Sequence, residues 1–278
     1  DLIQHSSETL AGRIRFLELS PFSVLEVHQH QQRAAGLERL WIRGGFPGSY
    51  LSTTEDDSWN WRGDFISSYV ERDIPFMGPR VASTTMRRLW SMLAHNNAQQ
   101  VNYSKLGASL GVSYKTVKNY IDTLTDFYML RQVQPWAGNS KKRLVKAPKI
   151  YLRDSGLAHR MLAIPDFETL LGHPAIGASW ESFVIENILR ALSDKWQHSF
   201  YRTSAQAEVD LVLEGPGRQV WAIEIKRSLA PKISKGFHFA SEDIRATRKF
   251  LVYSGDERFP LSNDVEAIGL IGFLEVLT

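Results

Sequence analysis

Residues 202–226 read RTSAQAEVDLVLEGPGRQVWAIEIK, and this stretch decides the fold of the last part of the chain. Its two apolar–polar alternations, EVDLVLE and VWAIEIK, are typical of strands, and Gly215-Pro216-Gly217 between them is typical of a turn. We therefore predict an antiparallel hairpin that pivots on Gly217. In that register Asp210 lies directly opposite Glu224 on the same face.

The alternation also assigns side chains to the two faces of this hairpin. One face is expected to carry Val209, Leu211, Leu213, Trp221, Ile223 and Ile225, and the other Asp210, Val212, Glu214, Val220, Ala222, Glu224 and Lys226. Two carboxylates that face each other across strands repel, so they call for a compensating cation unless solvent screens them. Lys226 supplies part of that charge, and a bound divalent metal ion would supply the rest. The plainer alternative is an exposed strand face, where Glu-x-Lys is common.

The spacing Asp210-x13-Glu224-x-Lys226 resembles the core of the PD-(D/E)xK nuclease superfamily. This resemblance implies metal-dependent phosphodiester hydrolysis, with Mg²⁺ or Mn²⁺ held by Asp210, Glu224 and the carbonyl of Ile225. Lys226 would then orient the attacking water or help to deprotonate it.

A helix before the sheet often offers a glutamate toward the metal ion in that superfamily. The segment GASWESFVIENILRAL, 177–192, is apolar at helical spacing, and Glu181 matches that position. Glu186, farther from the helix start, is the competing choice. With the later strand KFLVYSG, residues 154–278 predict a restriction-endonuclease-like mixed sheet flanked by helices.

Composition indicates a folded protein of two or three domains. The 278 residues include no cysteine, which excludes disulfides and thiolate metal sites and favours a reducing compartment. No apolar run approaches the roughly 18 residues of a membrane span, and no signal peptide is visible. We therefore expect a cytoplasmic protein without membrane contact. The chain begins at Asp1 rather than at methionine, which we interpret as a sign of a fragment.

The net charge of +3 is divided unevenly along the chain. Residues 83–153 contain twelve Lys and Arg and two acids, a net charge of +10, whereas the other 21 Lys and Arg and 28 acids leave −7. A basic module between acidic ones is the electrostatic signature of nucleic-acid binding.

The same basic module carries a helix-turn-helix pattern. TTMRRLWSMLAHN and YSKLGASL are expected helices, Gly111-Val112-Ser113 a turn, and Ser113 the N-cap of a helix over YKTVKNYIDTLTDFYML, 114–130. Val117, Ile121 and Leu124 fall on the core side of that helix. The outer face near its start carries the residues predicted to contact base edges and phosphates, which are Tyr114, Lys115, Lys118 and Asn119.

A wing is expected to follow the helix. RQVQPW and KAPKIYLRD read as two strands, and the loop between them places Lys141, Lys142 and Arg143 at its tip, where they would contact phosphate. The alternative is a winged helix used for protein contact, against which the charge of +10 argues.

Taken together, these patterns predict a multi-domain α/β chain. Residues 1–22 read as a short helix and a strand from Ile14 to Leu19, the remnant of something larger, and residues 23–82 as a helical lid or linker. Within the latter, DFISSYVERDI has a helical apolar stripe, and Glu71, Arg72 and Asp73 are interpreted as a solvated helix end. The winged helix would occupy 83–153 and the nuclease-like domain 154–278.

Nearly the whole chain resembles a prokaryotic family of AAA-type ATPases with a C-terminal domain of unknown function. The stretches that carry the resemblance are LAGRIRFLELSPFS, GGFP, YVERDI, KTVKNYIDTL, KAPKIYLRDSGL, ESFVIENIL, EVDLVLE and WAIEIK. The resemblance implies an N-terminal P-loop core that binds ATP and is missing here, since GxxxxGK[ST] does not occur in the sequence. It also makes Arg13 a candidate arginine finger and implies homo-oligomerisation through the ATPase region.

Two functions follow from these patterns. The preferred one is the DNA-binding part of an AAA-type ATPase whose nuclease-like domain cleaves phosphodiesters with a bound metal ion, its partner being double-stranded DNA. The alternative is a non-catalytic, ATPase-linked DNA-binding or regulatory protein.

Overall fold

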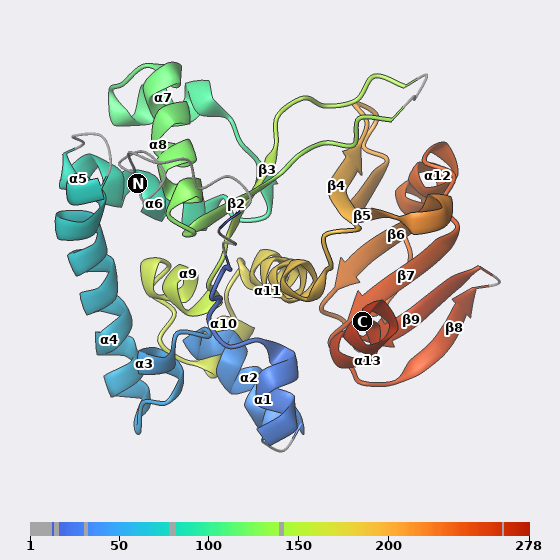
Figure 1. Ribbon diagram of the computed structural model, residues 1–278, viewed down its shortest axis with the longest axis horizontal. Coiled ribbons are helices and arrows are strands. Elements are labelled where there is room, and N and C mark those ends of the chain that lie inside the picture. Colours follow the sequence, from blue (N-terminus) through green and yellow to red (C-terminus); the bar gives the residue numbers. More distant parts are fainter. Residues whose placement is uncertain (1–12, 14–16, 31–32, 78–81, 139–141, 263) are drawn as a thin grey trace.

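The computed structural model describes residue 13 and residues 17–30, 33–77, 82–138, 142–262 and 264–278 (Figure 1). It is a mixed α/β structure with a helical N-terminal part and a six-stranded mixed sheet flanked by helices, as the sequence predicts. Among the described residues, no helix is both long and apolar enough to cross a membrane.

The first part of the chain is helical. Its helices are α1 (Val24–His30), α2 (Arg33–Arg43), α3 (Pro47–Tyr50), α4 (Glu55–Ser68) and α5 (Ile74–Met77), with a π-helical turn (Tyr69–Asp73) between the last two. Thr54 caps α4 by accepting a hydrogen bond from the amide of Asp57 at 3.1 Å. The prediction of a helix end at Glu71, Arg72 and Asp73 is wrong, because the helix continues through them as the π turn. The strand predicted from Ile14 to Leu19 lies partly outside the described residues, and Leu17–Leu19 are not in a strand.

The three helices predicted for this segment are present as α6 (Ser83–His95), α7 (Tyr103–Leu110) and α8 (Tyr114–Asp126). Ser113 caps α8 as predicted, since its hydroxyl accepts from the amide of Thr116 at 3.1 Å. Gly111 turns the chain at φ +69°, which glycine adopts without strain. The helix predicted over 114–130 is too long, because Tyr128 reverses the chain at φ +60° and a strand begins at Leu130.

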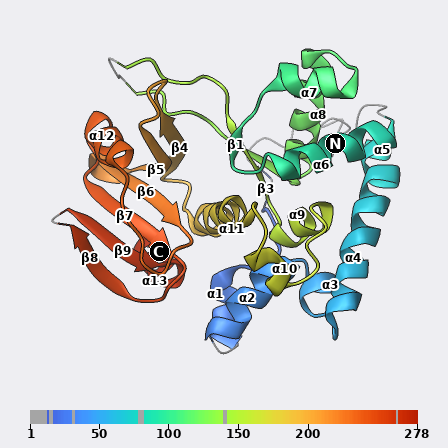
Figure 2. The same ribbon diagram turned by 180° about the vertical axis from the view of Figure 1, so that it is seen from behind.

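Three short strands complete this part of the molecule. They are β1 (Gln99–Gln100), β2 (Leu130–Val133) and β3 (Lys149–Leu152), in the order β1-β3-β2 and antiparallel throughout. Residues 134–138 and 142–148 between β2 and β3, which we call the arm, reach away from α8 to the large sheet in both views (Figure 1, Figure 2). The two wing strands are therefore shorter than the sequence predicts.

Contacts of the arm explain its course. The amide of Trp136 donates to the carbonyl of Phe200 at 2.7 Å, and the amide of Val145 donates to the carbonyl of Arg202 at 3.2 Å. The indole of Trp136 packs beside Tyr201, with ring centroids 5.8 Å apart. The arm therefore uses its backbone and its Trp to bind the edge of the large sheet. Contact of its basic tip with phosphate stays a prediction.

The large sheet belongs to the last part of the chain. Its strands are β4 (Gln197–Arg202), β5 (Glu208–Gly215), β6 (Gln219–Lys226), β7 (Arg248–Tyr253), β8 (Arg258–Ser262) and β9 (Val265–Gly269), and the helices of this part are α9 (Ser155–Met161), α10 (Phe167–Leu171), α11 (Ile176–Ala191), α12 (Lys235–Asp243) and α13 (Leu270–Leu277). The strand order is β4-β5-β6-β7-β9-β8, in which β6, β7 and β9 are parallel and the other neighbours antiparallel.

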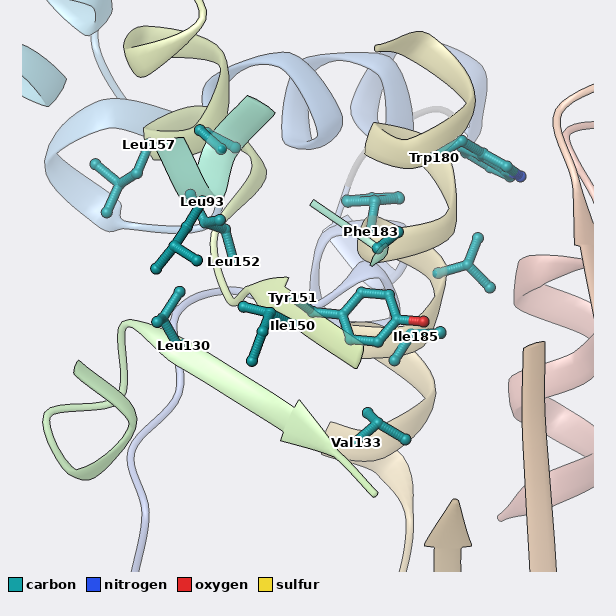
Figure 3. Packing of buried hydrophobic residues seen from close by; sticks show 14 of the residues in the cluster. Leu93, Leu130, Val133, Ile150, Tyr151, Leu152, Leu157, Trp180, Phe183 and Ile185 are labelled. Carbon is teal, nitrogen blue, oxygen red and sulfur yellow. The ribbon is translucent and has the colours of Figure 1, made fainter. Parts of the chain in front are cut away.

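Apolar side chains cover both faces of this sheet. On one face, buried residues of α11 and α13 join Leu211, Ile223 and Phe250 in a core that continues into the helical part. On the other face, α12 covers Val212 and Leu251. The continuous core runs across the domain boundary predicted at residue 153, and Figure 3 shows β2, β3, α9 and α11 contributing to it side by side. This core holds β3 beside α11. It thereby brings Lys149 of β3 close to Glu181 of α11 in the candidate site.

Candidate functional site: a buried carboxylate cluster

The β5–β6 hairpin has the predicted register. Leu211 pairs with Ile223 and Gly215 with Gln219 around Gly217, whose φ is +70°, and this pairing ends one residue before Asp210 and Glu224. There the backbone amide of Ile225 donates to the Asp210 carboxylate at 2.9 Å. Asp210 and Glu224 are only 7% and 4% exposed, which excludes the alternative of a solvated strand face.

One face assignment in the hairpin is wrong. Val209 lies in the core beneath α12 together with Val212, whereas Leu211 and Leu213 lie in the core beneath α11. The pairing of β4 with β5 shifts register between Ser199, which pairs with Val212, and Tyr201, which pairs with Val209. Such an irregularity breaks the simple alternation of side chains, which a sequence pattern of period two cannot show.

Glu181 on α11 lies beside the hairpin carboxylates, as predicted. Its side chain accepts hydrogen bonds from the Tyr151 hydroxyl at 2.8 Å and from the Lys149 ammonium at 3.1 Å. Glu186, the competing choice, belongs to a separate network in which it pairs with Arg131 and, at 3.3 Å, with Arg153. The structure therefore separates the two candidates and leaves Glu181 at the site.

Lys149 is the residue that sequence reasoning missed. Its side chain is 3% exposed, and its ammonium lies 2.8 Å from Glu208, 3.1 Å from Glu181 and 3.5 Å from Asp210. The sequence places Lys149 within the predicted wing strand KAPKIYLRD, where nothing signals that it turns inward. We call Glu181, Glu208, Asp210 and Glu224 the carboxylate cluster.

Lys226 is the second cation at the cluster, as the sequence predicts. Its ammonium lies 2.7 Å from Glu224, and its side chain is 42% exposed, so it closes the solvent side of the site. Arg202 adds a more distant contact to Glu208 at 3.4 Å. Part of the compensating charge that the facing carboxylates require therefore comes from within the chain.

Burial shifts the pKa values of the cluster. It raises the pKa of Glu181 to about 7, and the nearby charge of Asp210 adds to this rise while Lys149 opposes it. Burial and Asp210 likewise raise the pKa of Glu224 to about 7, against the effect of Lys226. Burial alone would lower the pKa of Lys149, but the surrounding carboxylates outweigh it and raise this pKa well above its ordinary value.

A divalent metal ion does not fit the cluster as it stands. Mg²⁺ and Mn²⁺ require several oxygen ligands that converge on one point. Three of the four carboxylates converge on Lys149 instead, and the described residues contain no group of three Asp, Glu or His side chains arranged to hold a metal ion. The sequence-based assignment of Mg²⁺ or Mn²⁺ to Asp210 and Glu224 stays a prediction.

The residues predicted to contact DNA on α8 lie together on its outer side. Tyr114 is 55% exposed, and Lys115, Lys118 and Asn119 are exposed as well. Lys118 also pairs with Asp122 one turn along, at 2.9 Å. The opposite side of the helix is fully buried, so the expected division of α8 into a core side and an outer side is confirmed.

The basic residues of the arm lie apart from α8. Lys142 approaches Asp243 of α12 at 3.7 Å, and the carbonyl of Arg143 accepts from the amide of Ser204 at 3.1 Å. Lys141 lies outside the described residues. Arg13, the candidate arginine finger, is exposed, and its role stays a prediction.

Two family models match the chain, one on each side of residue 170. Residues 34–168 match the domain of unknown function DUF8612, and residues 176–271 match the domain of unknown function DUF4143. The chain carries a DUF4143 domain. Glu181, Glu208, Asp210 and Glu224 all fall within the DUF4143 domain, whereas Lys149 falls within the DUF8612 match.

Two mycobacterial proteins are similar over almost the full chain. Uncharacterized proteins of Mycobacterium bovis and Mycobacterium tuberculosis are each 41% identical over 268 residues, which cover 96% of this chain and 59% of theirs. The chain thus spans 59% of the length of these relatives. No solved structure matches it.

Proposed function

We propose that the chain binds duplex DNA through α8 and is the DNA-binding or regulatory part of an AAA-type ATPase. The observation that carries the proposal is the exposed face at the start of α8. There two lysines, a tyrosine and an asparagine stand out from a helix whose other side is buried. Such a face suits a recognition helix, in which lysine meets phosphate and asparagine reads adenine.

Local geometry supports this proposal. The capped helices α7 and α8 are joined by the short turn at Gly111. The buried residues Val117, Ile121 and Leu124 hold α8 against the core. A rigid element positions contacts better than a loop does. Lys105, near the start of α7, is also exposed and adds positive charge to the same module.

The link to an ATPase rests on the sequence resemblance to AAA-type proteins. The DUF4143 domain accords with that resemblance, and the relatives are longer than this chain. ATP binding would need a phosphate-binding loop of the type GxxxxGK[ST], which this sequence does not contain. We therefore propose that ATP binds to the P-loop core of an AAA-type ATPase of which this chain would be one part, and not to this chain.

Salt-dependent binding tests the DNA proposal. Fluorescence anisotropy with a labelled duplex should show affinity that falls steeply with salt, because neutralised phosphates release counterions. A Lys115→Ala/Lys118→Ala variant should bind more weakly and lose up to ~0.9 of the log–log salt slope per lost phosphate contact. The control Lys195→Ala/Lys232→Ala, at exposed sites of the last part of the chain, should behave as wild type. Equal slopes for all three proteins would contradict the proposal.

Metal-dependent phosphodiester hydrolysis is the second candidate function. The placing of Asp210, Glu224 and Lys226 on neighbouring strands beside Glu181 favours it, whereas Lys149 among the carboxylates stands against it in this arrangement. A nuclease assay with Mg²⁺ or Mn²⁺ on single- and double-stranded DNA would decide. Cleavage that disappears in both Asp210→Asn and Lys226→Ala, with DNA binding intact, would establish the activity. If the wild-type protein cleaves neither substrate, DNA binding remains as the one proposed function.

A further inference from the structure

Lys149 joins two parts of the chain that match different family models. It begins β3, within residues 34–168, and each carboxylate that it contacts lies within residues 176–271. The lysine is nearly as inaccessible as a core residue, although its ammonium is charged. A buried charge of this kind is tolerated only when partners compensate it, which makes the contact specific.

Three carboxylates surround the three hydrogen-bond donors of the ammonium. Glu208 lies at 2.8 Å, Glu181 at 3.1 Å and Asp210 at 3.5 Å, and the ring of Phe200 lies 5.6 Å away. The cluster therefore already binds a cation inside the folded chain. Oxygen ligands of this number and hardness also suit a divalent metal ion, so an ammonium and a metal ion compete for the same carboxylates.

We infer that Lys149 is the resident cation of the carboxylate cluster and closes it to divalent metal ions while β3 is docked against α11 and β5. Without the ammonium, Glu181, Glu208 and Asp210 would face one another with only Arg202, 3.4 Å from Glu208, and Lys226, 2.7 Å from Glu224, to offset their charge. Their mutual repulsion would then be relieved by a bound metal ion. The inference goes beyond DNA binding by α8 and does not depend on it.

Manganese binding by a Lys149→Met variant tests the inference, because methionine keeps an unbranched side chain and removes the charge. Mn²⁺ binding is measured by electron paramagnetic resonance and by thermal unfolding of the full chain. Wild type should show no Mn²⁺-dependent change. Lys149→Met should unfold at a lower temperature in buffer and regain at least about 2 to 4 °C with Mn²⁺. Lys149→Met/Asp210→Asn should lose that response.

Two results would overturn the inference. One is Mn²⁺ binding by wild type as tight as that of Lys149→Met, and the other is a folded Lys149→Met protein that does not respond to Mn²⁺. If Lys149→Met does not fold, wild type is compared with Asp210→Asn, which keeps Lys149 and removes one carboxylate. Equal and negligible Mn²⁺ binding by these two proteins supports the closed cluster. Binding by wild type that Asp210→Asn lacks overturns it.

Discussion

Single residues at the carboxylate cluster show how the fold handles buried like charges. Asp210 and Glu224 follow the last paired residues of the β5–β6 hairpin, and both are buried. Lys149, 3.5 Å from Asp210, and Lys226, 2.7 Å from Glu224, neutralise part of this charge. The compensation is incomplete, because the pKa values of Glu181 and Glu224 remain raised to about 7.

These raised pKa values predict that the free energy of unfolding falls as pH rises. A carboxyl whose pKa is higher in the folded protein than its ordinary 4.5 stabilises the fold fully below pH 4.5 and loses that contribution as pH rises through about 7. For each such group the free energy of unfolding should fall by at most about 1.4 kcal/mol per pH unit. Glu181→Gln should therefore make the decline between pH 6.5 and 8 shallower.

Urea unfolding at a series of pH values measures this decline. His159, whose pKa is lowered to about 4 by burial, acts in the opposite sense, because its contribution is present above its ordinary value of 6.5 and is lost as pH falls. Burial lowers the pKa of His198 as well, so it acts in the same sense as His159, and both histidine contributions fade above pH 6.5 while the carboxyl decline continues. Identical slopes in wild type and Glu181→Gln would show that Glu181 does not titrate there.

At the scale of elements, local signals were predictable and docking was not. The turn at Gly217, the cap at Ser113 and the buried stripe of α8 are encoded by neighbouring residues, so the hairpin register and the three helices follow from sequence. The inward turn of Lys149 depends on which surface β3 packs against, a contact between residues far apart in sequence. The bulge that moves Val209 to the other face has no local signal either.

The arm is the element whose docking most changes the prediction from sequence. Trp136 is 9% exposed and is the largest side chain that the arm places against the sheet. Trp136→Ala should lower the free energy of unfolding by about 3 kcal/mol or more, because it leaves a cavity beside Tyr201. Leu229→Ala, at a residue that is 76% exposed, should change it by less than about 0.5 kcal/mol.

Urea unfolding of the two variants measures these changes, and hydrogen exchange locates them. Trp136→Ala should speed hydrogen exchange at the backbone amides of position 136 and of Phe200, which pair the arm with β4. A Trp136→Ala protein as stable as wild type, with unchanged exchange at these amides, would mean that the arm does not depend on its tryptophan.

At the scale of the whole molecule, ion pairs and the apolar core both connect the two sides of the domain boundary predicted at residue 153. Of the twelve Lys and Arg counted in residues 83–153, Arg131, Lys149 and Arg153 turn inward, with side chains 20%, 3% and 8% exposed. The net charge of that segment therefore overstates what it presents to DNA. The start of α8 does face solvent, with Tyr114 55% and the Lys118 side chain 56% exposed.

The continuous core predicts that the described parts unfold together. Residues from α6, β2, β3, α9 and α11 share one apolar cluster, so neither part can lose its structure without exposing the other. Urea unfolding followed by tryptophan fluorescence and by far-ultraviolet circular dichroism should give coincident single transitions. Two separated transitions would show that the parts on either side of residue 153 are independent domains.

The contact of α8 with duplex DNA can be measured directly because the chain has no native cysteine. Asn119→Cys places a single thiol on the outer face of α8, and Lys195→Cys places one at an exposed position between α11 and β4. The rate of maleimide alkylation of each thiol is followed as duplex DNA is added. We predict that DNA slows alkylation at position 119 in proportion to its binding and leaves the rate at position 195 unchanged. Binding of DNA with equal alkylation rates at both positions, or with protection at 195 alone, would contradict it.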